Sequence, residues 1–399
     1  MNDPSEEHPS DENRGDDDHG LSDRNSVLVE SLLAGEQRAL ARVLSKIENR
    51  TAGSRDILAA LYDRTGSTPV LGVTGSPGAG KSTLVDKLTK QYRARDETVG
   101  ILAVDPASPY TGGSVLGDRI RMGAAAGDRG VFIRSMSARG ALGGLSMATA
   151  DAVVALDAFG LDRIIIETVG AGQSEVDVVE TADSVAVVVQ PGSGDDVQLL
   201  KAGILEIGDL FVVNKADRPE AAGTVADLEE MIHLRSPSAD GRRTPTGGHH
   251  APDTADHHGG DFATAEDPQN ESPAGGGEVD GDRWTPPVLE TVATTAVGVP
   301  ELIEAIDRHQ RYLDRSGGDT ERRRRRATAA LERLLQRDLG VLSEQLIETR
   351  GGIDSLAGAI ARRETDPYSV VDDLIEPIET AVERAKTEGT ESDANRSQH

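Results

Sequence analysis

The sequence predicts an α/β protein with a doubly wound, mostly parallel sheet of the P-loop NTPase type and helical regions before and after it. Over residues 67–315, short runs that are apolar on both faces alternate with helical stretches and Gly-rich turns. Strands of this kind are typical of a parallel sheet that helices cover on both sides. A glycine-rich motif at residues 75–82, directly after the first run, fits the same fold.

The chain before the sheet is predicted to contain a disordered tail and a small helical region. Residues 1–20 are polar and acidic, a composition that cannot bury enough apolar surface to fold. Over residues 21–66, apolar side chains recur at helical spacing, as at Leu40, Val43, Leu44 and Ile47.

The central domain is predicted to contain seven strands and one disordered insertion. The strands are expected in VLGVTG, TVGILAVD, GVFIRSM, LDRIIIETVG, SVAVVVQPG, DLFVVNKAD and PPVLETVATTA. Residues 236–283 interrupt this pattern because they are rich in Gly, Pro, Asp and His and nearly free of large apolar residues. The pairs His249-His250 and His257-His258 could bind a metal, but solvated histidines in a flexible tract are the favoured interpretation.

After the last strand, the sequence predicts helices. GVPELIEAIDRHQRYL is expected to be one helix that completes the central domain. Residues 316–388 are expected to form a helical C-terminal arm, and residues 389–399 a disordered tail. The five arginines over residues 322–326 begin an amphipathic helix, for which a solvated or internally paired face is favoured over nucleic-acid binding.

Composition excludes several classes of function. The formal net charge of −27 disfavours nonspecific binding to nucleic acid or anionic lipid, and it is typical of a protein from a high-salt cytoplasm. The absence of cysteine excludes disulfides, thiol catalysis and a Cys-ligated zinc site. Neither a signal peptide nor an apolar run near the ~20 residues of a membrane span is found, so a cytoplasmic protein without membrane attachment is expected.

The motif GSPGAGKST predicts a phosphate-binding loop. It follows an apolar run and precedes a helical stretch, which is the context of a P-loop. The backbone N–H groups of such a loop wrap the phosphates, Lys81 reaches the β- and γ-phosphates, and the Ser82 hydroxyl binds Mg²⁺. The candidate residues are Gly75, Ser76, Pro77, Gly78, Ala79, Gly80, Lys81, Ser82 and Thr83.

The string NKAD, at the end of a later apolar run, indicates guanine. The Asp217 carboxylate can accept hydrogen bonds from the ring N–H and the exocyclic amine of guanine, a donor pair that adenine lacks. Asn214 is expected to hold the loop and the base, and the Lys215 stem to lie over the ring. The later residues Thr294, Thr295 and Ala296 are expected to close over the base. The bound nucleotide is therefore predicted to be GTP or GDP.

Three acidic residues between these motifs are candidates for sensing the γ-phosphate. Asp105 and Glu167 are expected at strand ends, and Asp118 in a Gly-rich loop, while Gly170 follows Glu167 closely. Acidic groups at such positions suit Mg²⁺ binding and water positioning. Ser82, Asp105 and Glu167 are the candidate metal ligands, and Lys81, Asp105, Asp118 and Glu167 the candidate catalytic residues. For Asp118, an ordinary turn cap is an equally good interpretation.

These motifs, together with DPASPYTGGSVLGDRIRM, RSMSARGALGGLS, ETVGAGQSEVDV and PGSGDDVQLLKAGI, resemble the MeaB/ArgK family of P-loop GTPases. The resemblance implies a homodimeric GTPase that protects and loads adenosylcobalamin-dependent methylmalonyl-CoA mutase, with the C-terminal arm as the dimerisation element. It also implies that residues 190–201 form a mobile segment that reports the nucleotide state to the mutase. An older family label, a lysine/arginine/ornithine transport ATPase or kinase, fits less well because Asp217 indicates guanine.

The sequence departs from that of many GTPases at one position that affects hydrolysis of GTP. Many GTPases place a water-orienting Gln directly after the Gly of their third motif, but Ala171 stands there in this chain and the nearest Gln is Gln173. We therefore expect slow intrinsic hydrolysis, with the partner completing the site. Two alternatives stay open: a GTPase that inserts a metal such as nickel into an enzyme, and an interaction scaffold that uses nucleotide only to set its shape.

Overall fold

The structure is a computed structural model that describes residues 21–105, 127–137, 144–168, 181–192, 207–235 and 284–396. The chain divides into two compact units, Met1–Arg323 and Arg324–His399. The tail predicted over residues 1–20 and the insertion predicted over residues 236–283 lie outside the described residues.

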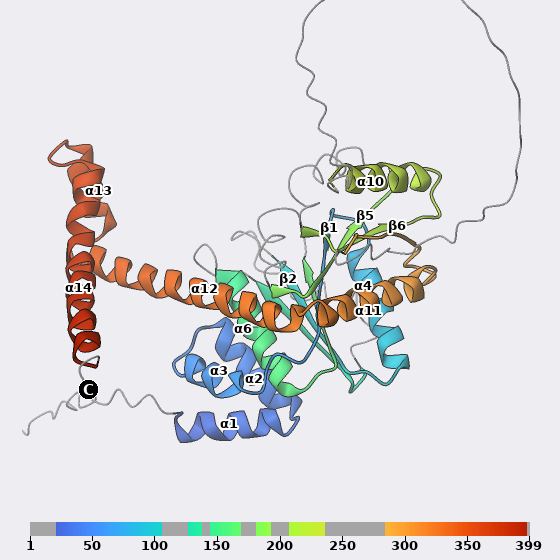
Figure 1. Cartoon of the computed structure of the whole chain (residues 1–399), viewed down its shortest axis with the longest axis horizontal. Coiled ribbons are helices and arrows are strands. Elements are labelled where there is room, and N and C mark those ends of the chain that lie inside the picture. Colours follow the sequence, from blue (N-terminus) through green and yellow to red (C-terminus); the bar gives the residue numbers. More distant parts are fainter. Residues whose placement is uncertain are drawn as a thin grey trace, which may run out of the picture. The chain divides into compact units, whose positions relative to one another are not determined.

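The first unit is built on a sheet of seven strands in the order β3-β2-β4-β1-β5-β6-β7 (Figure 1). Every neighbouring pair is parallel. Each predicted strand is present, which confirms the doubly wound α/β fold. The strands are β1 (Val70–Gly75), β2 (Val99–Asp105), β3 (Val131–Ser137), β4 (Arg163–Thr168), β5 (Ser184–Val189), β6 (Leu210–Asn214) and β7 (Val288–Thr291).

Helices cover both faces of the sheet, because successive strand residues point to opposite sides and both sides are apolar. The helices of this unit that the structure describes are α1 (Asp23–Leu33), α2 (Gln37–Glu48), α3 (Ser54–Tyr62), α4 (Lys81–Ala94), α6 (Gly144–Phe159), α10 (Ala221–Arg235) and α11 (Val299–Arg315). On one face, α4 and α11 bury Leu88 and Ile303 against Val73 of β1 and Val188 of β5.

The opposite face carries two helical groups. Over β2 and β4, the helices α1, α2, α3 and α6 form one apolar cluster that includes Ile164 and Ile166 (Figure 1). Over β5 and β6, α10 forms a second cluster in which Leu228 packs with Val187 and Phe211. These layers bury β1 at the centre of the sheet, so the loop that follows β1 is held on a rigid base.

The second unit is helical. α12 (Gly318–Thr349) begins in the first unit and continues into the second, which also contains α13 (Ile353–Ala361) and α14 (Pro367–Arg396). On α12, Leu331, Leu335, Leu339 and Leu342 recur at helical spacing and are 48–59% exposed. α14 reaches Arg396 and so includes part of the stretch for which the sequence predicts a disordered tail.

None of the helices in the described parts of the chain combines the length and the apolar character that crossing a lipid bilayer requires.

Candidate nucleotide site

The predicted phosphate and base motifs lie together at the carboxyl-terminal edge of the sheet. The P-loop follows β1, the string NKAD begins on the last residue of β6, and residues 294–296 follow β7. In the sheet, β1 pairs with β4 on one side and with β5 on the other. Ligand sites of open α/β sheets form outside the carboxyl ends of the strands, where the chain turns in opposite directions on the two sides.

The P-loop backbone needs glycine at three positions. Gly75, Gly78 and Gly80 have φ angles of +127°, +78° and +96°, which side chains with a Cβ rarely adopt. A Cβ on Gly75 would also overlap the backbone carbonyl oxygen of Val188, and a Cβ on Gly80 would overlap the side-chain nitrogen Nδ2 of Asn214. The loop is therefore packed tightly against the strand and the motif beside it.

Lys81 folds back over the loop that precedes it. Its side chain is 7% exposed, and its Nζ donates hydrogen bonds to the carbonyl oxygens of Gly75 at 2.5 Å and Ser76 at 2.9 Å. Lys81 is also the first residue of α4, whose N-terminus carries a partial positive charge. A positive side chain and a helix N-terminus at one point favour an anionic ligand.

Ser82 and Glu167 come together across the sheet edge. The Ser82 hydroxyl donates a 2.5 Å hydrogen bond to Oε1 of Glu167, which lies near the end of β4 and is buried. Next to it, the Thr168 hydroxyl donates to the Thr74 hydroxyl at 3.0 Å. Hydroxyl and carboxylate oxygens are ligands that Mg²⁺ prefers, so the pair that converges here fits a magnesium ion.

Asp105 ends β2 at the same edge. β2 and β4 are paired in register through Val104 and Thr168, so the backbone of Asp105 follows the position beside Thr168. The structure does not describe the Asp105 side chain. Asp118 and Gly170 lie outside the described residues, so their predicted roles stay predictions.

Asn214 joins the P-loop to the loop after β7. Its side chain is buried, and its Nδ2 donates to the carbonyl oxygen of Ala79 at 2.7 Å. Its Oδ1 accepts from the Thr291 hydroxyl at 3.1 Å and from the backbone N–H of Ala293 at 3.0 Å. Asn214 thus cross-links three segments, so an Asn here fits the structural part of the role that the sequence predicts.

Lys215 and Asp217 project from a tight turn after β6. Lys215 has a φ of +63°, and its Nζ donates to the carbonyl oxygen of Gly78 at 2.6 Å and to Oε1 of Gln190 at 2.7 Å. The Asp217 side chain is exposed, and within the described residues no hydrogen bond ends on its carboxylate. Both oxygens of that carboxylate are therefore available to a ligand.

Residues 294–296 form a short loop closed by backbone hydrogen bonds. The N–H of Val292 donates to the carbonyl oxygen of Val297 at 2.9 Å, and the N–H of Thr295 donates to the carbonyl oxygen of Val292 at 3.0 Å. Thr294 and Thr295 are exposed, while Ala296 has a φ of +64°. The loop stands beside the Lys215 turn, because the Ala216 N–H donates to the carbonyl oxygen of Thr291 at 3.0 Å.

Sequence reasoning missed two contacts of the site. It assigned no role to Thr291, which supports Asn214, and it placed Gln190 in a mobile segment without its contact to Lys215. The position of Gln190 directly after β5 could have indicated its contact with Lys215. That inference requires knowing that β5 lies between β1 and β6, and the motifs do not contain the strand order.

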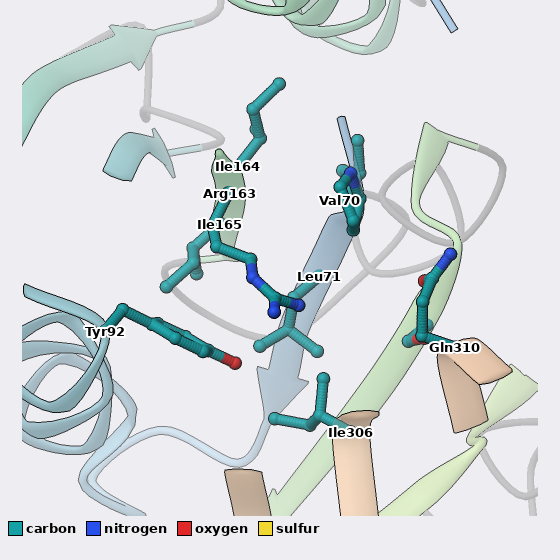
Figure 2. A pocket seen from close by; sticks show the side chains of 10 residues that line it. Val70, Leu71, Tyr92, Arg163, Ile164, Ile165, Ile306 and Gln310 are labelled. Carbon is teal, nitrogen blue, oxygen red and sulfur yellow. The ribbon is translucent and has the colours of Figure 1, made fainter. Parts of the chain in front are cut away.

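A pocket at the opposite edge of the sheet is lined by residues that include Val70, Arg163 and Ile306 (Figure 2). Within it, the guanidinium group of Arg163 lies 5.1 Å from the centre of the Tyr92 ring. Arg163 also pairs with Glu97 at 2.6 Å and with Asp307 at 3.2 Å. Since two carboxylates already balance this positive charge, the pocket does not favour an anionic ligand.

Comparison with known proteins identifies the family of the chain. The model of a family described as methylmalonyl-CoA mutase-associated GTPase MeaB matches residues 38–346. A candidate GTPase of Pyrococcus abyssi is 41% identical over 351 residues, which span 88% of this chain and 96% of that protein. The GTPase ArgK of Escherichia coli is 41% identical over 199 residues, which span 48% of this chain and 60% of ArgK.

The fold also has a solved counterpart. The crystal structure of a LAO/AO transport system kinase superposes with a TM-score of 0.59, covering 90% of this chain and 99% of that one. The two sequences are 23% identical, so this likeness supports the α/β fold and nothing more specific.

Proposed function

We propose that this chain, a P-loop GTPase that belongs to the MeaB family, couples GTP binding and hydrolysis to the assembly, cofactor loading or protection of an adenosylcobalamin-dependent methylmalonyl-CoA mutase. The observation that carries the proposal is the convergence of a P-loop and an Asn-Lys-x-Asp turn at one sheet edge, in a chain that the MeaB family model matches over residues 38–346. We propose that the protein works in the cytoplasm as a homodimer.

The phosphates of the nucleotide bind to the P-loop. Lys81 donates hydrogen bonds to the carbonyl oxygens of Gly75 and Ser76, which hold its ammonium group against the P-loop. Phosphate oxygens are stronger acceptors than these carbonyls because hydrogen bonds between charged groups are shorter and stronger. The lysine can therefore exchange its partners without a change of fold.

Ser82, Asp105 and Glu167 would hold a magnesium ion. When it is bound, Mg²⁺ supplies positive charge that offsets the charge developing on the phosphate oxygens. The buried position of Glu167 beside the Ser82 hydroxyl keeps both oxygens in one place, where they would be ligands of the ion. Asp118 is expected to complete the set of groups that respond to the γ-phosphate.

Asp217 selects guanine. Its exposed carboxylate can accept from the ring N–H and the exocyclic amine of the base, whereas adenine would leave it without donors. GTP and GDP should therefore bind far more tightly than ATP and ADP. Thr294, Thr295 and Ala296, which are tied to the Lys215 turn, cover the base from the side of β7.

The output of hydrolysis is a change of shape that the mutase reads. Ala171 replaces the water-orienting Gln of many GTPases, so intrinsic hydrolysis is slow and the bound mutase raises it by ordering the segments around Asp105, Asp118 and Glu167.

The half-exposed apolar residues of α12, which include Leu331 and Leu335, fit the surface of a second copy of the chain.

The test is GTP hydrolysis measured in high salt with and without the cognate methylmalonyl-CoA mutase. We expect slow turnover by the chain alone and faster turnover when the mutase is added. A Lys81→Ala variant measured in parallel separates this activity from contaminating hydrolases. If the mutase neither binds nor changes the rate, the proposed partner is wrong although the chain is a GTPase.

A further inference from the structure

We propose that Gln190 is a positioning residue for guanine-nucleotide binding, and that it acts by holding the ammonium group of Lys215. The inference rests on the nucleotide site proposed above. It assigns to Gln190 a role separate from those of the P-loop and of Asp217.

The contact depends on the order of the strands. Gln190 directly follows β5, and β5 lies between β1, which carries the P-loop, and β6, which carries the Lys215 turn (Figure 1). The register fixes this position closely, since Val188 of β5 is beside Gly75 of β1 and Val189 is beside Val213 of β6. A side chain just past the end of β5 is therefore within reach of both neighbouring loops.

Two acceptors from two different segments fix the end of the Lys215 side chain. The backbone turn at φ +63° sets where the side chain starts, but a lysine has four further rotatable bonds and loses much freedom when it is ordered. Nζ is held by the carbonyl oxygen of Gly78 at 2.6 Å and by Oε1 of Gln190 at 2.7 Å. Gly78 is part of the loop that receives the phosphates, so Gln190 is the support that lies outside that loop.

The chemistry of the side chain suits this role. A glutamine offers a neutral acceptor, so it orients the ammonium group and leaves its positive charge to the nucleotide. A glutamate at the same place would keep the hydrogen bond but would add a negative charge beside the phosphate site. Gln190 is half-buried, and the residue after it, Pro191, is buried, so the acceptor sits on a fixed backbone.

Calorimetric titration with GDP and Mg²⁺ tests the inference through a double-mutant cycle. Gln190→Leu keeps the volume of the side chain but removes the acceptor, and it should weaken GDP binding about two- to tenfold, as the loss of one hydrogen bond does. If Gln190 acts through Lys215, the same substitution made in a Lys215→Met background should change GDP affinity less than about twofold. The inference would be overturned if Gln190→Leu weakened GDP binding by the same factor in the Lys215→Met background as in the unchanged chain. It would also be overturned if Gln190→Leu bound GDP as tightly as the unchanged chain does.

A second variant guards against a general disturbance of the fold. Gln190→Glu retains an acceptor of the same length, so Lys215→Met should still weaken GDP binding in the Gln190→Glu background at least as much as in the unchanged chain. Equal GDP binding by Gln190→Glu with and without Lys215→Met would count against the inference. Failure of the unchanged chain to bind GDP would instead remove the proposed nucleotide site, so the two failures are distinguishable.

Discussion

The two edges of the sheet use polar side chains in opposite ways. At the carboxyl-terminal edge, Lys81 and Lys215 donate to backbone carbonyl oxygens of the P-loop, and phosphate oxygens would replace these partners in the proposed complex. At the amino-terminal edge, Ser184, Asp209 and His309 form a cluster in which side chains contact one another. Its Ser184 Oγ lies 2.7 Å from His309 Nδ1, and Asp209 Oδ1 lies 3.5 Å from His309 Nε2.

Aromatic rings close the amino-terminal cluster. Trp284 donates its Nε1–H to the carbonyl oxygen of Asp209 at 2.8 Å, and its ring centre lies 4.7 Å from that of His309. Ser184 and His309 are each 2% exposed, so the hydroxyl and imidazole groups cannot reach a substrate, although a serine, a histidine and an aspartate stand in line. We therefore expect polar side chains to bind a ligand at the carboxyl-terminal edge and to stabilise the fold at the amino-terminal edge, where aromatic rings exclude water.

The largest effect we expect is at the carboxyl-terminal edge. Lys81→Ala should lower GTP turnover on the order of a thousandfold, because the variant loses a positive charge at the phosphates. It should change the free energy of unfolding by no more than about 1 kcal/mol. A turnover assay and urea denaturation measure the two quantities.

Lys90→Ala on the same helix is the matched control for Lys81→Ala. Lys90 is 46% exposed and pairs with Asp86 at 2.7 Å, so its removal should leave turnover unchanged. Equal turnover by Lys81→Ala and Lys90→Ala would contradict the assignment of the carboxyl-terminal edge as the reactive one.

Asp217→Asn sharpens the comparison at the same edge. It should weaken GDP binding about a hundredfold, because an amide cannot accept both donors of guanine. Binding of xanthosine diphosphate should improve, since xanthine has a carbonyl where guanine has an amine. Calorimetry with both nucleotides gives the result, and Asp227→Asn, an exposed aspartate on α10, should change neither affinity.

His309→Ala should show the reverse pattern at the amino-terminal edge. Removing a buried ring between Trp284 and Ser184 leaves a cavity and an unpaired hydroxyl, so the free energy of unfolding should fall by about 2–4 kcal/mol. GTP turnover at low temperature should stay near that of the unchanged chain. Denaturation and turnover of His233→Ala, an exposed histidine on α10, provide the reference, and a His309→Ala variant as stable as His233→Ala would show that the cluster contributes nothing.

The smallest effect concerns pH. Burial raises the pKa of the Asp209 carboxyl to about 7, with a contribution from the charge of Asp183, while the Val185 N–H opposes the shift. The folded state then binds this proton more tightly than the unfolded chain. The free energy of unfolding should therefore fall as pH rises from about 4, the ordinary pKa of Asp, to about 7.

Asp209→Asn should remove this decline. Because the Asp209 side chain is 32% exposed, solvent screens the effect, and we expect a change of about 1 kcal/mol between pH 4 and pH 7. Asp162→Asn is the control of opposite sign, since hydrogen bonds from the Thr98 N–H and hydroxyl lower the pKa of Asp162. The contribution of Asp162 to the free energy of unfolding should be lost only as pH falls below the ordinary pKa of an Asp. Urea denaturation at several pH values gives the free energy of unfolding of each variant. If this free energy changes with pH in the same way for both variants, the raised pKa of Asp209 is wrong.

The sequence alone determined the strands, the P-loop and the base motif, because each is encoded by neighbouring residues. Apolar runs such as those of β4 and β5 must be buried on both faces, and the three P-loop glycines are required by the backbone itself. Contiguous motifs carry their geometry with them, which is why residue order by itself predicts Lys81, Ser82 and Asp217 as candidate site residues.

Only the tertiary structure decided which distant residues meet. Placing β5 between β1 and β6 brings Gln190 to Lys215, 25 positions away, and packing α11 on the sheet brings His309 to Ser184, 125 positions away. Sequence periodicity specifies that a strand or helix is buried, but not which neighbour it is buried against. The partners are chosen by strand order and helix packing, whose free energy is spread over the whole core and leaves no signature at any one residue.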